Sequence, residues 1–367
     1  MRASARRKPP DFGIIAAVAG LVGIGIVMIF SASSNRTFVS FGDPYYYLKR
    51  QALWVVISVA AMVFAMNFDY WRLRSLARPI FVFSLVLLVI VLIPGLGSGV
   101  HGARRWVGIG IARFQPSELE KLALTIFLAS LLCERGRARS LRRGIVPVVL
   151  IAGLIFGLIL LQPDLGTAVA CAGTIAVMLF VAGANMWHLA GLGLAAVPVL
   201  YLAIFSAEYR RRRFLAFLNP WADPLDTGFH IIQSLYALGS GSLFGLGLGQ
   251  GRQKFWYLPE QHTDFIFSVL GEELGFLGGA AVIALFALLA WRGFRVAVRA
   301  PDGFSCLLAA GLTAMIVLQA AVNIGVVTAS IPITGIPLPF ISHGGSSLIF
   351  TMAGVGILLN ISRYQQA

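Results

Sequence analysis

The chain has 367 residues, of which 58% are hydrophobic and only 12% are charged, and its mean hydropathy is +0.84. Soluble globular domains carry about 25% charged residues, so this composition excludes that class and indicates a polytopic membrane protein. The formal charge of +14 accompanies no nucleic-acid pattern of basic and aromatic residues, and a membrane surface is its simplest partner.

Apolar runs long enough to cross a bilayer, which takes roughly 20 residues, recur along the whole chain. The basic start and the apolar run after it resemble a signal peptide, but the run is long enough to span and no small-residue cleavage site follows. We therefore expect it to remain as the first helix. The runs predict an all-α polytopic membrane protein with about ten transmembrane helices, at about 12–32, 50–68, 79–95, 118–133, 144–161, 166–183, 187–206, 265–291, 304–328 and 342–362.

The distribution of Lys and Arg gives the orientation. With the N-terminus inside, more than half of the 29 basic residues fall in inner loops and tails, as the positive-inside rule requires. This predicts a cytoplasmic N-terminal tail (1–11), one transmembrane domain (12–362) and a cytoplasmic C-terminal tail (363–367). A large outer loop, 207–264, then connects helices seven and eight; loops of this length are usually functional.

The segment from Phe229 to Gly249 is the main challenge to this topology. It is apolar and nearly long enough to span, yet it is rich in glycine and serine. A span here would move Arg292, Arg295 and Arg299 to the outer side. We therefore predict a surface-lying or re-entrant segment, whose backbone must be covered by protein or water.

Ionisable residues near the outer helix ends come from four separate parts of the chain. Because an unpaired charge in a helix bundle is costly, these residues should meet one another or water, and we expect them to converge on one pocket. A basic cluster beside hydrocarbon suits a lipid with a phosphate or pyrophosphate head. The residues are Arg104, Arg105, Glu118, Lys121, Asp164 and Asp264, with Glu272 and Glu273 deeper.

Structural interpretations stay open for most of them. Glu118 and Lys121 are three residues apart and can form an ion pair on one helix face. Asp164, in QPDLGT, can cap a helix N-terminus. Glu272 and Glu273 fit either a buried structural anchor or part of a polar path.

Asp264 is the strongest candidate for chemistry. It directly precedes the apolar residues 265–267, and Thr263 is a better-placed helix cap. Desolvation beside apolar residues raises the pKa of a carboxyl group, as a general base acting on a sugar hydroxyl requires. His262 either orients the site or is a solvated loop histidine, and Glu260 is best explained as a solvated loop carboxylate.

Several blocks resemble the signature blocks of the SEDS family of shape, elongation, division and sporulation proteins. The similarity runs from about Asp11 to Tyr364 and is closer to the FtsW and SpoVE branch, although QPDLGT also occurs in RodA. One departure is His343 in FISHGGSS, where the family usually has tyrosine. The blocks are GARRW (102–106), FQPSELEK (114–121), QPDLGT (162–167), LPEQHTDFIFSVLGEELG (258–275) and TGIPLPFISHGGSSL (334–348).

The resemblance implies a ten-helix peptidoglycan glycosyltransferase in the bacterial cytoplasmic membrane. Such an enzyme polymerises lipid II, an undecaprenyl-pyrophosphoryl disaccharide-pentapeptide, on the outer face for septal or elongation synthesis. The implied partners are a class B penicillin-binding protein, which is a transpeptidase, and other divisome or elongasome membrane proteins. The family's essential aspartate maps onto Asp264, its functional glutamate and lysine onto Glu118 and Lys121, and its QPDLGT aspartate onto Asp164.

The resemblance leads to one predicted mechanism. Asp264 takes the proton from the acceptor's GlcNAc 4-hydroxyl, and that oxygen attacks the donor's MurNAc anomeric carbon with inversion to a β-1,4 link. Arg104, Arg105 and Lys121 stabilise the leaving pyrophosphate, with Glu118, Asp164 and His262 as further substrate-binding residues. Gly344 and Gly345 shape the groove, and Glu272 and Glu273 support it.

Two other functions and one cofactor are left open. A lipid II flippase also needs ten helices and a charged cavity, but it needs charges along the whole path, whereas here they gather on the outer side. A scaffold that only recruits the penicillin-binding protein is the third reading. No ligand set in the sequence fixes a metal, so a divalent cation (Mg²⁺ or Mn²⁺) stays open as a cofactor.

Overall fold

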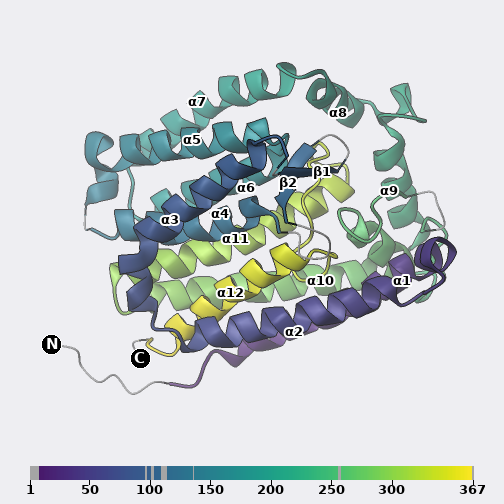
Figure 1. Ribbon diagram of the computed structural model, residues 1–367, viewed down its shortest axis with the longest axis horizontal. Coiled ribbons are helices and arrows are strands. Elements are labelled where there is room, and N and C mark those ends of the chain that lie inside the picture. Colours follow the sequence, from purple (N-terminus) through teal and green to yellow (C-terminus); the bar gives the residue numbers. More distant parts are fainter. Residues whose placement is uncertain are drawn as a thin grey trace.

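The computed structural model describes residues 8–95, 97–100, 103–108, 114–134, 136–254 and 258–365, with 98–100, 103 and 104 described in the backbone alone. This part of the chain forms a bundle of long helices that lie side by side (Figure 1). Eight of these helices are long and apolar enough to cross a membrane, counting the π turn Leu141–Ile145 with α5. Helices α4 and α6, with 17 residues each, supply the other two of the ten predicted spans. The ten are α1 (Phe12–Phe41), α2 (Tyr46–Asn67), α3 (Tyr70–Leu92), α4 (Pro116–Leu132), α5 (Val146–Leu161), α6 (Leu165–Val181), α7 (Met186–Phe205), α10 (Ile266–Val298), α11 (Gly303–Val327) and α12 (Gly345–Ser362).

Some helices extend past the apolar runs that predicted them. Helix α1 continues to Phe41, beyond the expected end near residue 32, and stops where Gly42 adopts a left-handed conformation with φ 70°. Helix α3 begins at Tyr70, well before the expected start near residue 79, because the Asp69 side chain caps its first turn. Caps, rather than the edge of the hydrocarbon, therefore set these ends.

The inner end of the bundle brings the two chain ends together, as the predicted topology requires (Figure 1). The Lys8 backbone N–H donates to the Arg363 carbonyl oxygen at 2.9 Å. The Asp11 N–H donates to Ser362 Oγ at 3.1 Å, and the Asp11 carboxylate lies 3.6 Å from Arg292.

Helix α11 lies at the centre of the bundle. In the most apolar stretch of α11, 72% of the residues are buried, whereas the corresponding value for α7 is 6%. Helix α7 stands at the edge of the molecule with α8 (Glu208–Leu218) (Figure 1). Helix α11 packs against α4, α6 and α10. Polar side chains on its outer half therefore lie beneath any site at the outer face.

The large outer loop contains α8, the 3-10 turn η3 (Pro220–Ala222) and α9 (Phe229–Ser240). As predicted, the segment from residue 229 to 249 does not span. Its first half is an amphipathic helix with Ile231, Ile232 and Ala237 buried. Its second half consists of glycine turns that fold back against α10.

Helix α10 is interrupted at Gly275, where φ is 67° and ψ is −166°. The interruption frees backbone groups that the glycine turns satisfy. The Leu246 and Gly247 N–H groups donate to the carbonyls of Glu272 and Glu273, each at 3.0 Å, and the Phe276 N–H donates to Ser242 O at 2.8 Å. These hydrogen bonds give partners to the backbone N–H and carbonyl groups at the interruption, as backbone inside the protein requires.

A small antiparallel hairpin stands at the outer end of the bundle, and the sequence did not predict it. Strand β1 (Gly97–Val100) pairs with β2 (Ala103–Val107), and Val107 forms a further bridge with Phe114. The strands are four and five residues long, too short for a clear alternating pattern. The hairpin presents Arg105 toward the turn between α5 and α6.

Candidate active site

Asp264 closes the outer loop, two residues before α10 begins, and its backbone is fixed from two directions. Asn323 on α11 donates through Nδ2 to the Asp264 carbonyl oxygen at 2.8 Å and to the Ile336 carbonyl oxygen at 2.7 Å. Ser342 Oγ donates to the Thr263 carbonyl oxygen at 2.6 Å. The position of the Asp264 side chain is therefore set by α11 and by the loop that precedes α12.

The Asp264 carboxyl group is half-buried and meets a glycine on one side. Gly335 has φ +69°, and a Cβ placed there would lie 3.3 Å from Asp264 Oδ2. Burial raises the pKa of Asp264 to about 7; the nearby Glu260 carboxylate adds to the rise, whereas the charge of Arg105 opposes it. Such a carboxyl group is a base of useful strength near neutral pH.

Arg105 binds the turn between α5 and α6. Its Nε donates to Gln162 O at 3.1 Å, its Nη2 donates to Pro163 O, and its Nη1 lies 4.0 Å from Asp164 Oδ2. The Arg105 charge also acts on Asp264. The structure thus brings together three of the predicted residues: Arg105, Asp164 and Asp264.

Asp164 acts as the N-cap of α6. Its carboxylate accepts from the Thr167 N–H at 3.2 Å and from Thr167 Oγ1 at 2.9 Å. The capping interpretation therefore describes its contacts, while its charge also reaches Asp264.

Arg213, on α8, completes the charged surroundings of Asp264 and was not selected from the sequence. Its charge acts on both Asp264 and Arg105. Helical spacing could have indicated Arg213. Arg212, in the same run of arginines, follows Glu208 by four residues, and the two side chains form an ion pair at 2.6 Å. That pairing turns Arg213 to a different face of the helix.

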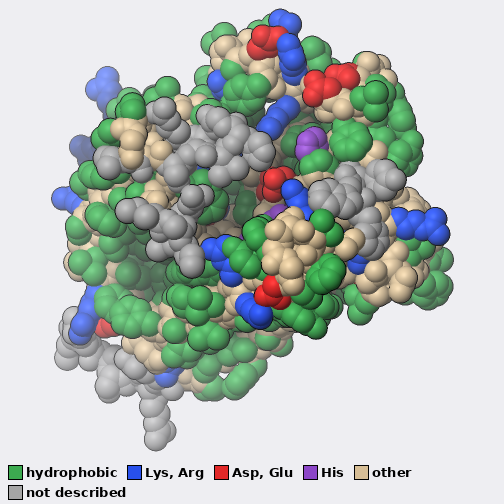
Figure 2. Space-filling model, turned by 45° about the vertical axis from the view of Figure 1, so that its right-hand side comes forward, with side chains coloured by type: hydrophobic (Ala, Val, Ile, Leu, Met, Phe, Trp, Pro, Cys, Tyr) green, Lys and Arg blue, Asp and Glu red, His purple; other side chains and the backbone are tan. Residues whose placement is uncertain are grey.

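One face of the protein is hollowed (Figure 2). Figure 2 shows a depression with acidic, basic and histidine side chains around it, between surfaces that are mostly apolar. An open, charged hollow of this kind can receive a polar head group while the surrounding apolar surface faces lipid.

Glu118 and Lys121 form a buried ion pair below this hollow. Their side chains are 3% and 4% exposed and 2.9 Å apart. Lys121 also donates to Gln319 Oε1, and Gln319 Nε2 donates to Pro337 O at 2.9 Å. Among the described residues, no hydrogen bond or ion pair joins Lys121 to Asp264. The pair connects α4 and α11 to the loop that also positions Asp264.

Glu272 and Glu273 hold the loop before Asp264 against α10. Glu273 accepts from Ser31 Oγ and Lys254 Nζ, both at 2.7 Å, and from the Gly249 N–H at 3.0 Å. Glu272 accepts from the Arg252 N–H at 2.7 Å. These contacts correspond to the anchor interpretation. Lys254 was not selected from the sequence, because its partner lies on a helix whose packing the sequence does not reveal.

His262 and Glu260 differ from the solvated loop residues considered above. His262 is only 8% exposed, and its ring lies 4.5 Å from the Tyr47 ring, centroid to centroid. Burial keeps the pKa of His262 below its ordinary value. Glu260 is half-buried and accepts from Thr263 Oγ1 at 2.9 Å. Neither side chain is fully solvated.

The two glycines at the start of α12 have different surroundings. A Cβ on Gly345 would lie 2.4 Å from the Trp54 ring, so only glycine allows this contact between α12 and α2. Gly344 precedes the helix and has room for a Cβ, which would lie 3.7 Å from its nearest neighbour.

Two further predictions concern Arg104 and a metal ion. The Arg104 side chain lies outside the described residues. Across the described part of the chain, no group of three or more His, Cys, Asp or Glu side chains is arranged to hold a metal ion.

Known proteins resemble this chain over nearly its whole length. A family model for cell cycle proteins, FtsW/RodA/SpoVE, matches residues 13–367. Stage V sporulation protein E of Bacillus subtilis (strain 168) is 49% identical over 98% of this chain and 99% of its own length. A probable peptidoglycan glycosyltransferase FtsW of Geobacter metallireducens is 45% identical over 96% of this chain and 94% of its own length.

Solved structures extend the likeness to the fold. A crystal structure of the rod shape determining protein RodA of Thermus thermophilus is 32% identical with a TM-score of 0.73, covering 97% of this chain and 98% of that one. A chain from a study of polymerization and crosslinking by a peptidoglycan synthase complex is 34% identical with a TM-score of 0.80, covering 97% and 99%. The chain belongs to the SEDS family of FtsW, RodA and SpoVE cell cycle proteins.

Proposed function

We propose that this protein is a peptidoglycan glycosyltransferase that polymerises lipid II on the outer face of the cytoplasmic membrane, in septal or sporulation cell-wall synthesis. The relatives named FtsW and stage V sporulation protein E support this branch of the family. The observation that carries the proposal is the half-buried Asp264 carboxyl group, whose pKa is raised to about 7 by burial while the charges of Arg105 and Arg213 act on it.

Asp264 acts as the general base of the reaction. It takes the proton from the 4-hydroxyl of the acceptor GlcNAc as that oxygen forms a bond to the anomeric carbon of the donor MurNAc. The bond from this carbon to the pyrophosphate oxygen breaks, and its electron pair leaves with the lipid pyrophosphate. An α-linked donor gives a β-1,4 product, so the reaction inverts. A base with a pKa near the working pH suits this proton transfer.

The leaving pyrophosphate requires positive charge on the outer side of the bundle. Arg105 and Arg213 supply it beside Asp264, and arginine binds phosphate oxygens through paired N–H groups. We retain Arg104 as a further candidate. Lys121 is engaged by Glu118 and Gln319, so we assign Glu118 and Lys121 to the support of the hollow's floor, where the pair adds fixed positive and negative charge.

A class B penicillin-binding protein is the proposed partner, with other divisome membrane proteins. The support is the TM-score of 0.80 to a chain from a complex described as coordinating polymerization and crosslinking. Its transpeptidase would cross-link the strands that this protein makes.

Polymerisation and flipping are distinguished by one reconstitution experiment. Purified protein in liposomes receives fluorescent lipid II, with the partner's transpeptidase blocked, and both polymer and transbilayer movement are measured. We expect polymer from the wild type and none from Asp264→Ala, while Asp226→Asn, which changes an exposed carboxylate of the same outer loop, behaves as the wild type. Lipid II that crosses the bilayer without polymer would instead support the flippase.

A further inference from the structure

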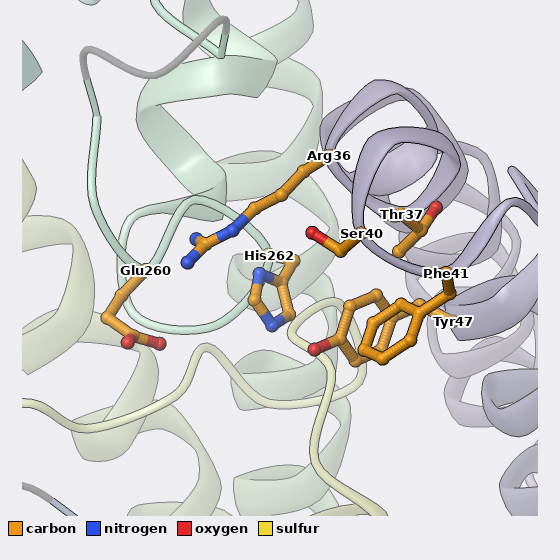
Figure 3. Close-up of a pocket in the computed structure, with 7 residues that line it drawn as sticks. All are labelled: Arg36, Thr37, Ser40, Phe41, Tyr47, Glu260 and His262. Carbon is orange, nitrogen blue, oxygen red and sulfur yellow. The ribbon is translucent and has the colours of Figure 1, made fainter.

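A cavity lies at the outer ends of α1 and α2, close in the chain to Asp264 through Glu260 and His262. Its volume is about 270 Å³, and its lining includes Arg36, Ser40, Tyr47, Glu260 and His262 (Figure 3). Residues from two helices and from the outer loop thus meet around one cavity. No step of the reaction described above uses it.

Two polar side chains in this cavity lack partners within the described part of the chain. His262 is 92% buried, as its exposed fraction is 8%, and its Nδ1 has no hydrogen-bond partner there. The exposed Arg36 side chain also makes no hydrogen bond or ion pair among the described residues. A buried polar atom is normally satisfied, so His262 Nδ1 offers the cavity unused hydrogen-bonding capacity.

The His262 ring is held in place from behind. It packs on the Tyr47 ring at 4.5 Å and lies 6.0 Å from the His343 ring, centroid to centroid. The His343 N–H donates to the His262 carbonyl oxygen at 2.9 Å, and His343 Nδ1 lies 2.9 Å from Gln51 Oε1. Figure 3 shows the His262 ring between Arg36 and Tyr47, with Glu260 across the cavity. The ring is therefore a rigid part of the wall.

The charges of the cavity restrict its ligand. A phosphate head group alone would suit Arg36 but would be repelled by Glu260, since a like charge nearby is unfavourable. A neutral sugar would use neither the charge of Arg36 nor that of Glu260. A peptide that carries both a free carboxylate and a free amine satisfies both charged groups, and the Tyr47 ring offers apolar contact.

The distance to the catalytic residue fits a peptide attached to the reacting sugar. Glu260 and Asp264 belong to one short loop, and four residues of extended chain span at most about 14 Å. A pentapeptide reaches about 17 Å when extended. A sugar at Asp264 can therefore place its peptide in the neighbouring cavity.

We propose that this cavity binds the peptide stem of lipid II, with Arg36 and His262 holding a carboxylate of the peptide and Glu260 holding its amine. This inference rests on the proposed function, because it assigns a peptide-bearing lipid as substrate. The cavity would then distinguish substrates with an intact stem from those without it.

The test compares two lipid-linked disaccharides, one with the pentapeptide and one without it, binding to purified full-length protein in nanodiscs. Dissociation constants are measured for the wild type, Arg36→Gln and Arg36→Lys. Arg211→Gln is the control, since Arg211 is another exposed outer arginine whose side chain makes no hydrogen bond or ion pair among the described residues. Thermal unfolding verifies that each variant is folded.

We expect Arg36→Gln to weaken binding of the peptide-bearing lipid by about tenfold, as loss of one charge-assisted hydrogen bond predicts. Binding of the peptide-free lipid should not change, and Arg36→Lys should recover part of the loss. An equal loss for both lipids, or no loss for either, would overturn the inference. Competition by phosphatidylglycerol at Arg36 would overturn it in favour of a lipid head group. If the wild type bound neither disaccharide, the proposed function itself would fail.

Discussion

Asn323 holds the peptide group of Asp264 by a 2.8 Å hydrogen bond from its Nδ2 to the Asp264 carbonyl oxygen. The same amide group donates to Ile336 O at 2.7 Å. Asn323 is 1% exposed and belongs to α11, the central helix of the bundle. The base is thereby attached to a rigid element although it stands at the end of a long loop. Catalytic geometry depends on such support, because small displacements are costly in rate.

Asn323→Asp should therefore reduce polymerisation strongly. The substitution preserves shape but replaces the donor by a carboxylate, which repels both carbonyl oxygens. We expect a rate loss of about 100-fold, in the range reported for misplaced catalytic groups, measured with labelled lipid II. Asn185→Asp is the control: Asn185 accepts from the Trp187 N–H at 3.0 Å, and aspartate accepts equally well at an N-cap. Equal activity of both variants would contradict the positioning role.

The pH dependence of polymerisation should follow the Asp264 carboxyl group. Its pKa is raised to about 7, first by burial and then by Glu260. A base acts when deprotonated, so the rate at saturating lipid II should rise with pH and level off above this value. Glu260→Gln removes a negative neighbour, lowers the pKa of Asp264 and should move the midpoint to lower pH.

The control for this shift is Glu208→Gln, which changes an exposed outer carboxylate paired with Arg212. Its pH profile should match that of the wild type. A midpoint that moves upward in Glu260→Gln, or stays fixed, would show that another group governs the rate.

The interruption of α10 should make Gly275 intolerant of any side chain. With φ +67°, a Cβ at Gly275 would lie 2.3 Å from Gly245 N and 2.6 Å from Leu243 O, both backbone atoms. We expect Gly275→Ala to lower the unfolding free energy by about 3 kcal/mol, the upper end for local backbone strain. Gly153→Ala, where a Cβ has nothing within 4 Å, should be neutral. Thermal unfolding in detergent measures the stability of both variants. Equal melting temperatures would contradict the close packing of α10 against the glycine turns.

The buried pair of Lys254 and Glu273 should show strong coupling. The two charges are 2.7 Å apart, with side chains 5% and 0% exposed. Lys254→Met leaves a buried carboxylate without its counter-ion and should cost about 3–5 kcal/mol, whereas removing both charges should cost much less. A double-mutant cycle with Glu273→Met measures this coupling. Additive losses would mean that the two charges act independently.

The membrane-spanning helices were predictable because the hydropathy of one continuous stretch of sequence is enough to identify each of them. Apolar runs located all ten bundle helices, and the glycine content of residues 229–249 correctly argued against an eleventh span. Helix ends were less predictable, since Asp69 and Gly42 set them through capping, not through hydrophobicity. The hairpin β1–β2 was not predicted, because strands of four and five residues are too short to show a clear alternation of apolar and polar residues.

Candidate site residues could be proposed from the sequence where a single motif contained them. Asp264, Asp164 and Arg105 stood out because each is a charge beside an apolar helix end, and the structure brings them together. Arg213 and Arg36 were missed, because their roles depend on partners more than 40 residues away in the chain. Local spacing separates Arg213 from the paired Arg212, but it does not reveal these distant partners.

Whether Asp264 is the base of glycan polymerisation is tested most directly by comparing the polymerisation rates of the wild type and of a variant without the carboxylate. Wild type and Asp264→Asn are compared with labelled lipid II at pH 8, where the carboxylate is ionised given its pKa of about 7. We expect Asp264→Asn to polymerise about 10²–10⁴-fold more slowly than the wild type, because the isosteric amide cannot accept the proton. The variant should still bind lipid II. Polymer formed by Asp264→Asn at the wild-type rate would contradict this role of Asp264.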